Sequence, residues 1–352
     1  MTKKNGNSTA RLIDAARDYE QTVRALLAFA ALVTHNGVSK RDTAQFGLGR
    51  RMTPAPVPAP TGDNPEAVVQ PDDVTPDLVA QKSATYGIVA EAKKSLDRDG
   101  HYEQHIQQLR KYDSALAGWW TETGQVEHSD AAILVHQSRG RRFARYLDEC
   151  RVRGDDSVGP HSSVIEFNES QERVLYYFFR LASGQVRDSE LAARLDEGVS
   201  IPIEEVLQSF GNVRYYDDPP PMVFLLACLW LDYLPSLLPD GKYDEETGKH
   251  KLKVSIAAAT EELQAAHGSS VLHQDERAVR FPTTTWIRRA LNRLVEHQLA
   301  LPPSGDDDVY TVLYGPFKKD VRERFAELEG AKGAAEAPNE GQMRLFGEPA
   351  GA

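Results

Sequence analysis

One stretch early in the chain constrains the fold most, because it predicts a β-hairpin whose register is fixed by its turn. Pro76–Gln81 and Tyr86–Lys93 are short and rich in apolar residues, as strands are, and a polar turn centred near Ala84 separates them. With that turn, Asp77 is expected to lie opposite Glu91. We therefore expect two antiparallel strands that bring these two carboxylates together.

The segments around this hairpin alternate between helical and strand patterns. An apolar stripe predicts a first helix over about Ser8–Leu32, and the Pro-rich stretch 53–73 is expected to be an extended, solvated loop. Downstream patterns predict a helix, a buried strand and a further helix, which cover about Tyr102–Trp119, Ala131–His136 and Arg141–Arg151. This order is typical of an α/β sandwich, so we expect one domain of that class over residues 1–153.

Beyond residue 153 the patterns are mainly helical. Gly154–Ser163 is expected to be a linker. The helices expected after it cover Gln171–Leu181, Ser189–Leu195, Ile203–Phe210, Ser255–Ala266 and Thr284–Leu299, and Val309–Tyr314 is expected to be a strand. From Gly330 the chain is mostly Ala, Gly, Glu and Pro, a composition that cannot build a core. We therefore expect a linker at 154–163, helical modules at 164–240 and 241–329, and a disordered tail at 330–352.

The composition favours a soluble protein in a reducing compartment. Only two cysteines occur, Cys150 and Cys228, and they lack the spacing of a zinc site or a disulfide framework. The N-terminus lacks the apolar region of a signal peptide. Met222–Leu238 is apolar, but it is short for a membrane span and contains Pro235, so we expect a buried core helix. The sequence therefore predicts a cytoplasmic protein that contacts no membrane.

The net charge of −11 argues against a protein that coats nucleic acid indiscriminately. Basic residues nevertheless gather at two places in the first half of the chain. One group contains Lys40, Arg41, Arg50 and Arg51, and the other contains Arg139, Arg141, Arg142, Arg145, Arg151 and Arg153. Local distribution matters more than the sum, and the sequence leaves open whether each group is only a solvated face.

The hairpin carries the residues with the clearest chemistry. Glu91 and Lys93 are two positions apart on one strand, so their side chains share a face, and Asp77 lies opposite Glu91. Metal-assisted hydrolysis of a phosphodiester needs such a group: carboxylates hold Mg²⁺, which polarises the phosphoryl oxygen and acidifies water. A lysine can orient that water or stabilise charge on the phosphate. The alternative is a surface hairpin whose Glu91 and Lys93 merely pair across solvent.

Pro76-Asp77 followed by Glu91-Ala92-Lys93 resembles the signature of the PD-(D/E)xK nuclease superfamily, whose members share the restriction-endonuclease-like fold. The resemblance implies that Asp77, Glu91 and the carbonyl of Ala92 bind Mg²⁺, with Mn²⁺ able to substitute, and that Lys93 is catalytic. It covers roughly residues 10–153. The long Pro-rich loop departs from the family pattern because it obscures the usual strand before Asp77.

The helix after the hairpin extends this resemblance to the RecB-like branch of the superfamily. Gln108-Leu109-Arg110-Lys111-Tyr112 is similar to the QxxxY element of that branch. Gln108 and Tyr112 are one helical turn apart and share a face, which in the family lines the substrate groove. A glutamate of the first helix often joins the family's metal site, and Glu20 matches it best by position.

The helix expected at Thr284 places basic residues on its outer face. Arg288, Arg289 and Asn292 face outward, and the helix precedes the hairpin-like stretch 302–314. This order resembles a winged-helix module over 241–329, and the helical module at 164–240 is a second candidate for that architecture. The second helix of such a module enters the DNA major groove. The acidic run 306–308 at the expected wing tip would repel phosphate. DNA binding, protein docking and a structural role therefore all remain open for this module.

The tail contains an isolated apolar pair that suits a docking peptide. Gln342, Leu345 and Phe346 resemble the QxxLF peptide by which bacterial proteins bind the DNA polymerase sliding clamp. Leu345 and Phe346 would fill an apolar pocket, and Gln342 would fix the register by hydrogen bonds. The alternative is that the pair packs back on the protein itself.

Together these features predict a Mg²⁺-dependent deoxyribonuclease that acts in bacterial restriction, antiviral defence or DNA repair, at the nucleoid in the cytoplasm. DNA is the expected substrate, although RNA is not excluded, and homo-oligomers are compatible with the sequence. Endonucleolytic and exonucleolytic action are both open. The alternative is a DNA-binding regulator or adaptor that uses a catalytically inactive nuclease-like fold.

Overall fold

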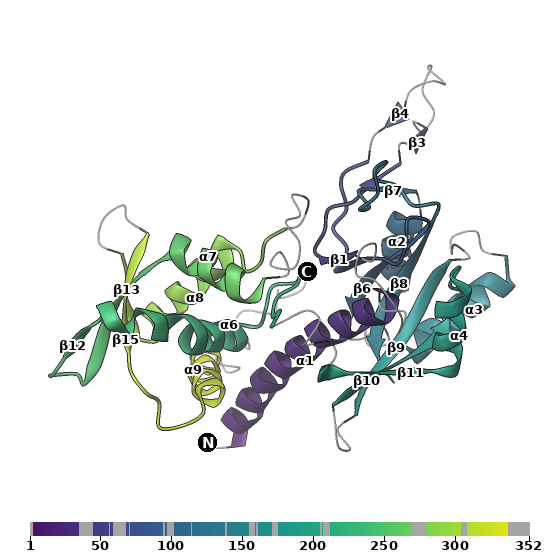
Figure 1. Ribbon diagram of the computed structural model, residues 1–352. Helices are drawn as coiled ribbons and strands as arrows, with labels where there is room; N and C mark the ends of the chain where they lie inside the picture. The colour runs from purple at the N-terminus through teal and green to yellow at the C-terminus, as the bar shows by residue number, and fades with distance from the viewer. Residues whose placement is uncertain are drawn as a thin grey trace, which may run out of the picture. The chain divides into compact units, whose positions relative to one another are not determined.

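The computed structural model describes residues 3–34, 45–55, 57–58, 68–69, 71–93, 96, 102–113, 115–137, 139–154, 159, 161–170, 175–204, 206, 212–268, 277, 279–303 and 308–336. The chain divides into two compact units, which we name after their sheets (Figure 1). The seven-strand unit comprises Glu20–Pro219 and Gln264–Pro282, and the four-strand unit comprises Met1–Tyr19, Pro220–Leu263 and Thr283–Ala352. The long helices α1 (Lys3–Thr34) and α7 (Ile256–His267) contribute to both.

The seven-strand unit is a mixed α/β structure, as the sequence predicts. The sheet order is β1 (Gln45–Leu48), β5 (Leu78–Gln81), β6 (Tyr86–Lys93), β8 (His128–His136), β9 (Ser162–Ser170), β10 (Tyr176–Ser183) and β11 (Val199–Pro202). The central pairs β6–β8 and β8–β9 are parallel, and the remaining neighbours are antiparallel. Two short strand pairs join β2 (Thr53–Pro54) with β7 (Leu116–Ala117), and β3 (Val57–Pro58) with β4 (Val68–Val69).

Helices cover both faces of this sheet (Figure 1). On one face, α1 packs Phe29 against Phe179 of β10, with ring centroids 5.5 Å apart. On the other face, the sheet packs its apolar side chains against α2 (Tyr102–Asp113) and α3 (Arg141–Val152), including Leu109 and Phe143. The short helix α4 (Ser189–Glu197) contacts β10.

The predicted hairpin is confirmed in its register. Leu78 pairs with Ala90 and Gln81 pairs with Gly87, which places Asp77, one residue before β5, opposite Glu91. This agreement arises because a turn of four residues determines the register of the strands that it joins. The predicted Pro-rich loop is only partly a loop, since it includes β2, β3 and β4.

Three expected elements are wrong. The predicted helix over Gln171–Leu181 is strand β10 in its described part, because its run of aromatic residues suits a sheet and buries Tyr177 and Phe179 on one face. The expected linker Gly154–Ser163 ends in strand β9, so the sheet continues past residue 153. The predicted helix Tyr102–Trp119 stops at Asp113, and Gly118 follows with φ +115°, which a helix does not allow.

The four-strand unit places two helices between its strands. Its sheet order is β12 (Lys242–Asp244), β13 (Lys249–Ser255), β15 (Val309–Tyr314) and β14 (Ala300–Leu301). Along the chain, β13 leads into α7, then α8 (Thr284–Glu296), and back through β14 to β15. The Thr283 hydroxyl accepts from the Trp286 N–H at 3.3 Å and so caps the N-terminus of α8. The last helix, α9 (Val321–Glu336), runs through Gly330, so the expected tail begins as helix.

The apolar stretch expected to be a core helix forms one continuous helical run. It consists of α6 (Met222–Cys228), a π-helical turn (Leu229–Tyr233) and a 3₁₀ segment (Leu234–Asp240), which contains Pro235 and Pro239. Met222–Asp240 is, in the described chain, the one helix long and apolar enough to cross a membrane, with a mean hydropathy of 1.7. Its apolar residues pack against α8 and α9, and Trp230 stacks on Phe317. This burial is what a core helix of a soluble protein has.

Two expectations fall outside the described residues. The docking peptide with Gln342, Leu345 and Phe346 lies wholly there, and the predicted helix Ile203–Phe210 lies there in most of its length.

Candidate active site

The candidate site begins with two carboxylates that the hairpin buries side by side. Asp77 is 4% exposed and Glu91 is 5% exposed. The Ala92 N–H donates a hydrogen bond of 2.7 Å to Asp77 Oδ2, so the aspartate is tied to the strand that carries Glu91. Burying a carboxylate lowers the stability of the fold unless the group is hydrogen-bonded or paired. These two carboxylates are therefore unusual within an otherwise apolar core.

Lys93 completes the group that the sequence predicts. Its Nζ lies 3.2 Å from Glu91 Oε2, and its side chain is 25% exposed. Because residues two apart on a strand project to the same face, Lys93 and Glu91 point to the face that α2 covers. The structure therefore brings Asp77, Glu91 and Lys93 together at the end of β6.

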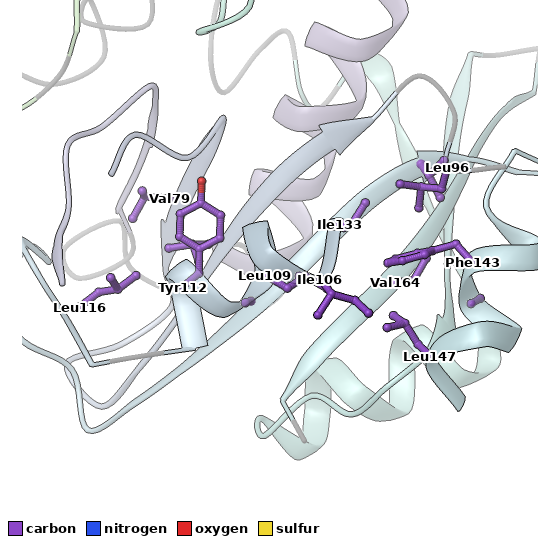
Figure 2. Close-up of a cluster of buried hydrophobic side chains, with 14 of the residues drawn as sticks. Val79, Leu96, Ile106, Leu109, Tyr112, Leu116, Ile133, Phe143, Leu147 and Val164 are labelled. Carbon is purple, nitrogen blue, oxygen red and sulfur yellow. The ribbon is translucent and has the colours of Figure 1, made fainter. Parts of the chain in front are cut away.

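Tyr112 of α2 holds the other side of Glu91. The Tyr112 hydroxyl donates a hydrogen bond to Glu91 Oε1, and Gln108 hydrogen-bonds to the Tyr112 side chain. Figure 2 shows the Tyr112 ring beside the aliphatic cluster of Ile106 and Leu109, with its hydroxyl pointing away from them. Burial raises the pKa of Tyr112, and the negative charge of Glu91 raises it further, so the hydroxyl keeps its proton and remains a donor.

The charge balance of the site is negative. Burial raises the pKa of Asp77 well above its ordinary value, and the negative charge of Glu91 raises it further, whereas the Ala92 hydrogen bond lowers it. A bound cation would favour the charged form of Asp77 and so oppose the rise of this pKa.

Two further carboxylates influence the site, and the sequence did not point to them. Asp217 has a pKa raised to about 6 by burial and by the negative charges of Glu91 and Asp218. Asp218 in turn raises the pKa of Asp77. Both lie on the segment 212–218, which begins with a hydrogen bond between the Arg214 N–H and the His267 carbonyl. No local pattern could have found them, because only the folded chain places this segment near the hairpin.

The structure does not bring Glu20 to this group. Glu20 belongs to α1, where it pairs with Arg24 at 2.7 Å and raises the pKa of Tyr177 on β10. Tyr177 lies on the face of the sheet that α1 covers, whereas Glu91 and Lys93 lie on the face that α2 covers. The expected contribution of Glu20 to a metal site therefore has no geometric support.

Two carboxylates of the site could bind a metal ion. Within the described ranges, no three or more His, Cys, Asp or Glu side chains are grouped as ligands of one ion. Asp77 and Glu91 offer carboxylate oxygens, which are the donors that Mg²⁺ and Mn²⁺ prefer, and Ala92 lies on the same strand between Glu91 and Lys93. This donor set fits a hard divalent cation that keeps several water ligands.

A row of side chains in register with Lys93 crosses the sheet and contains two further charged residues. Lys93 pairs with Val135 of β8, Val135 pairs with Glu166 of β9, and Glu166 pairs with Arg180 of β10. Glu166 is buried, and Arg180 Nη2 lies 3.6 Å from its Oε2. Residues in register share a face, so these side chains lie on the side that carries the candidate site.

Helix α8 of the four-strand unit exposes the three residues expected on its outer face, and the structure pairs Arg288 among them. Arg288 forms a bidentate ion pair with Asp308, with distances of 2.6 and 2.7 Å. The exposed Asn292 accepts a 2.6 Å hydrogen bond from the Tyr310 hydroxyl. Arg289 is also exposed. Asp308, near the expected wing tip, thus neutralises a basic residue of this helix.

Compared with known proteins, the chain matches no protein-family model, no curated protein sequence and no solved structure. The geometry of the site is therefore the basis for a functional proposal.

Proposed function

We propose that this protein is a metal-dependent nuclease that hydrolyses DNA phosphodiester bonds at the Asp77–Glu91–Lys93 site. The observation that carries the proposal is the burial of two carboxylates opposite each other on paired strands, with Lys93 Nζ 3.2 Å from Glu91. Proteins tolerate such unfavourable burial mainly where function requires it. A hairpin whose Glu91 and Lys93 merely paired across solvent would leave both carboxylates exposed.

Mg²⁺, with Mn²⁺ as a substitute, is the cofactor that Asp77, Glu91 and the Ala92 carbonyl would hold. When bound, the ion would polarise a phosphoryl oxygen and acidify a water molecule. The two carboxylates would keep that site negative enough to attract the cation and to retain it beside a phosphate.

The remaining residues act by charge and by position. Lys93 stabilises the negative charge that develops on the phosphoryl oxygens in the transition state. Tyr112 fixes the rotamer of Glu91 through its hydrogen bond, and Gln108 fixes Tyr112. Tyr112 and Gln108 therefore position the Glu91 carboxylate, in addition to any contact that they make with substrate.

The test is cleavage of defined substrates by the purified full chain. Plasmid, linear duplex DNA, single-stranded DNA and RNA are each incubated with Mg²⁺, with Mn²⁺ or with EDTA. We expect cleavage of at least one DNA substrate with either metal and none with EDTA. Intact DNA with both metals would reject the nuclease, and cleavage of RNA alone would change the substrate class.

A second candidate function is a DNA-binding regulator or adaptor that cuts nothing. The observation that favours it is the order strand, helix, helix, strand, strand in the four-strand unit, which resembles a winged helix with α8 as its exposed basic helix. A regulator should keep its DNA affinity in EDTA and leave DNA intact with Mg²⁺ or Mn²⁺.

Bacterial restriction, antiviral defence or DNA repair, at the nucleoid, is the setting that a nuclease of this kind suits. The peptide with Gln342, Leu345 and Phe346 would bind the sliding clamp and tether the enzyme to DNA that carries one. A peptide of this length should bind with a dissociation constant of about 1–100 μM. Calorimetry of the clamp with the wild-type peptide and with a Leu345→Ala, Phe346→Ala peptide tests this binding. Equal heats from both peptides would reject the clamp as the partner.

A further inference from the structure

Helix α3 presents arginines to solvent along its first turns. Arg141, Arg142 and Arg145 are all exposed. In the described part of the chain, Arg141 and Arg145 form no hydrogen bond or ion pair. Arg151 at the other end of the helix differs, because it bonds to Ser183 Oγ at 2.7 Å and pairs with Asp148. The two ends of α3 therefore use their arginines differently.

The exposed arginines lie at the end of the sheet that carries the candidate site. A Cβ atom on Gly140, the residue before α3, would come within 2.5 Å of Val135 Cγ1, so α3 begins directly over Val135. Val135 is the strand neighbour of Lys93, and neighbouring strands are about 4.8 Å apart. The Leu96 N–H, just beyond β6, also donates to the Arg139 carbonyl at 2.8 Å. The start of α3 is thus adjacent to Lys93.

The arginines at the start of α3 are also expected to destabilise this helix. The N-terminal end of a helix is electropositive and favours acidic residues, yet α3 has none in its first turn and begins with two arginines. Arg141 and Arg145 are four residues apart, a spacing at which like charges repel. Charged residues that break such local rules are common at functional surfaces.

We propose that Arg141, Arg142 and Arg145 form a surface that binds the phosphodiester backbone of nucleic acid and delivers it to Lys93 and Glu91. The inference rests on the proposed nuclease function and adds the path of the substrate. An exposed basic face beside an otherwise acidic chain fits a polyanion, and repeated phosphates match repeated guanidinium groups along one helix. Arg180, 49% exposed and in register with Lys93 through Val135 and Glu166, extends the basic character across the same face.

The experiment measures DNA binding separately from cleavage. The full chain binds a short fluorescein-labelled DNA duplex in EDTA over a KCl series, as wild type and as Arg141→Ala with Arg145→Ala. The matched control, Arg11→Ala with Arg17→Ala, removes the same charge from exposed positions of α1. We expect the α3 variant to bind at least about tenfold more weakly and to lower the slope of log affinity against log salt by about 2, because each phosphate contact contributes about 0.9. Its thermal midpoint should equal or exceed that of wild type.

The binding measurements distinguish three results that bear on the proposal. Equal affinities and salt slopes for the α3 variant and the control, or no DNA binding by wild type, would overturn the surface. Binding to anionic lipid vesicles that needs Arg141 and Arg145, without DNA binding, would overturn it in favour of a membrane. If the α3 variant loses DNA binding while wild type cuts no DNA with Mg²⁺ or Mn²⁺, the surface stands and the nuclease proposal fails.

Discussion

Asp77 is the residue of the site whose ionised form the fold destabilises most clearly. It is buried beside another carboxylate, and the Ala92 hydrogen bond and the charge of Lys93 oppose the rise of its pKa. A group whose pKa is raised on folding binds its proton more tightly in the folded state than in the unfolded chain. Stability is then lost as the pH rises above the ordinary value of 3.8 toward the folded pKa.

Asp77→Asn should therefore stabilise the metal-free protein while abolishing cleavage. The amide oxygen can still accept the Ala92 hydrogen bond, and the charge that opposes Glu91 is gone. In EDTA, the thermal midpoints of variant and wild type should differ little near pH 4, and the variant's should be higher at pH 8. Each 1 kcal/mol corresponds to about 2–4 °C for a unit of this size. A lower midpoint for the variant at pH 8 would show that the fold does not destabilise ionised Asp77.

A substitution at Tyr112 distinguishes whether this residue positions Glu91 or binds substrate. Tyr112→Phe keeps the ring in the core and removes the donor to Glu91, and a hydrogen bond to a charged group is worth about 1.5–3 kcal/mol. We expect kcat to fall about 10- to 100-fold with KM for DNA unchanged. Tyr102→Phe, on the same helix but packed on Phe143, is the control and should cut like wild type. A raised KM with normal kcat would instead place Tyr112 in the substrate groove.

At the scale of elements, the sequence predicted what local interactions decide. The hairpin register follows from four turn residues, and the helical pattern that starts at Thr284 identifies α8, so both were correct. Strand β10 was missed because its buried aromatic residues are also compatible with a helix until the pairing with β9 is known. Asp217 and Asp218 were missed because their proximity to Glu91 and Asp77, respectively, depends on contacts between segments distant in sequence.

Gly87 of β6 makes the packing of the hairpin testable. A Cβ atom at Gly87 would overlap the buried indole of Trp119, whereas at Gly47 of β1 it would meet Trp120 at an ordinary 3.4 Å. Gly87→Ala should lower the free energy of unfolding by about 1–3 kcal/mol in urea titrations. Gly47→Ala, the control, should change it by less than about 1 kcal/mol. Equal effects would mean that Trp119 does not cover β6.

The pairing of Arg288 with Asp308 gives α8 its own test. Asp308→Asn frees Arg288 without altering the helix, so duplex affinity should rise about two- to tenfold if this helix contacts phosphates. Asp240→Asn, also exposed in the four-strand unit, controls for the change in net charge. Fluorescence anisotropy that gives the same affinity for both variants would favour protein docking for this module.

At the scale of the whole chain, linear boundaries describe the protein poorly. The seven-strand unit is built from two separate segments and the four-strand unit from three, so the expected division at residues 154–163 falls inside one sheet. Composition is likewise an incomplete guide, because a net charge of −11 coexists with the exposed arginines of α3. Function is therefore better inferred from the residues that the fold brings together than from totals over the chain.

The most direct measurement is DNA cleavage by Glu91→Gln beside Glu20→Gln, in Mg²⁺ and in Mn²⁺. Both changes remove one carboxylate charge with little change in size, but only Glu91 lies with Asp77, Lys93 and Tyr112. We expect Glu91→Gln to lose at least about 100-fold in rate, as for removal of a group that stabilises the transition state, and Glu20→Gln to cut like wild type. Wild-type cleavage by Glu91→Gln, with or without loss in Glu20→Gln, would contradict the assignment of this site.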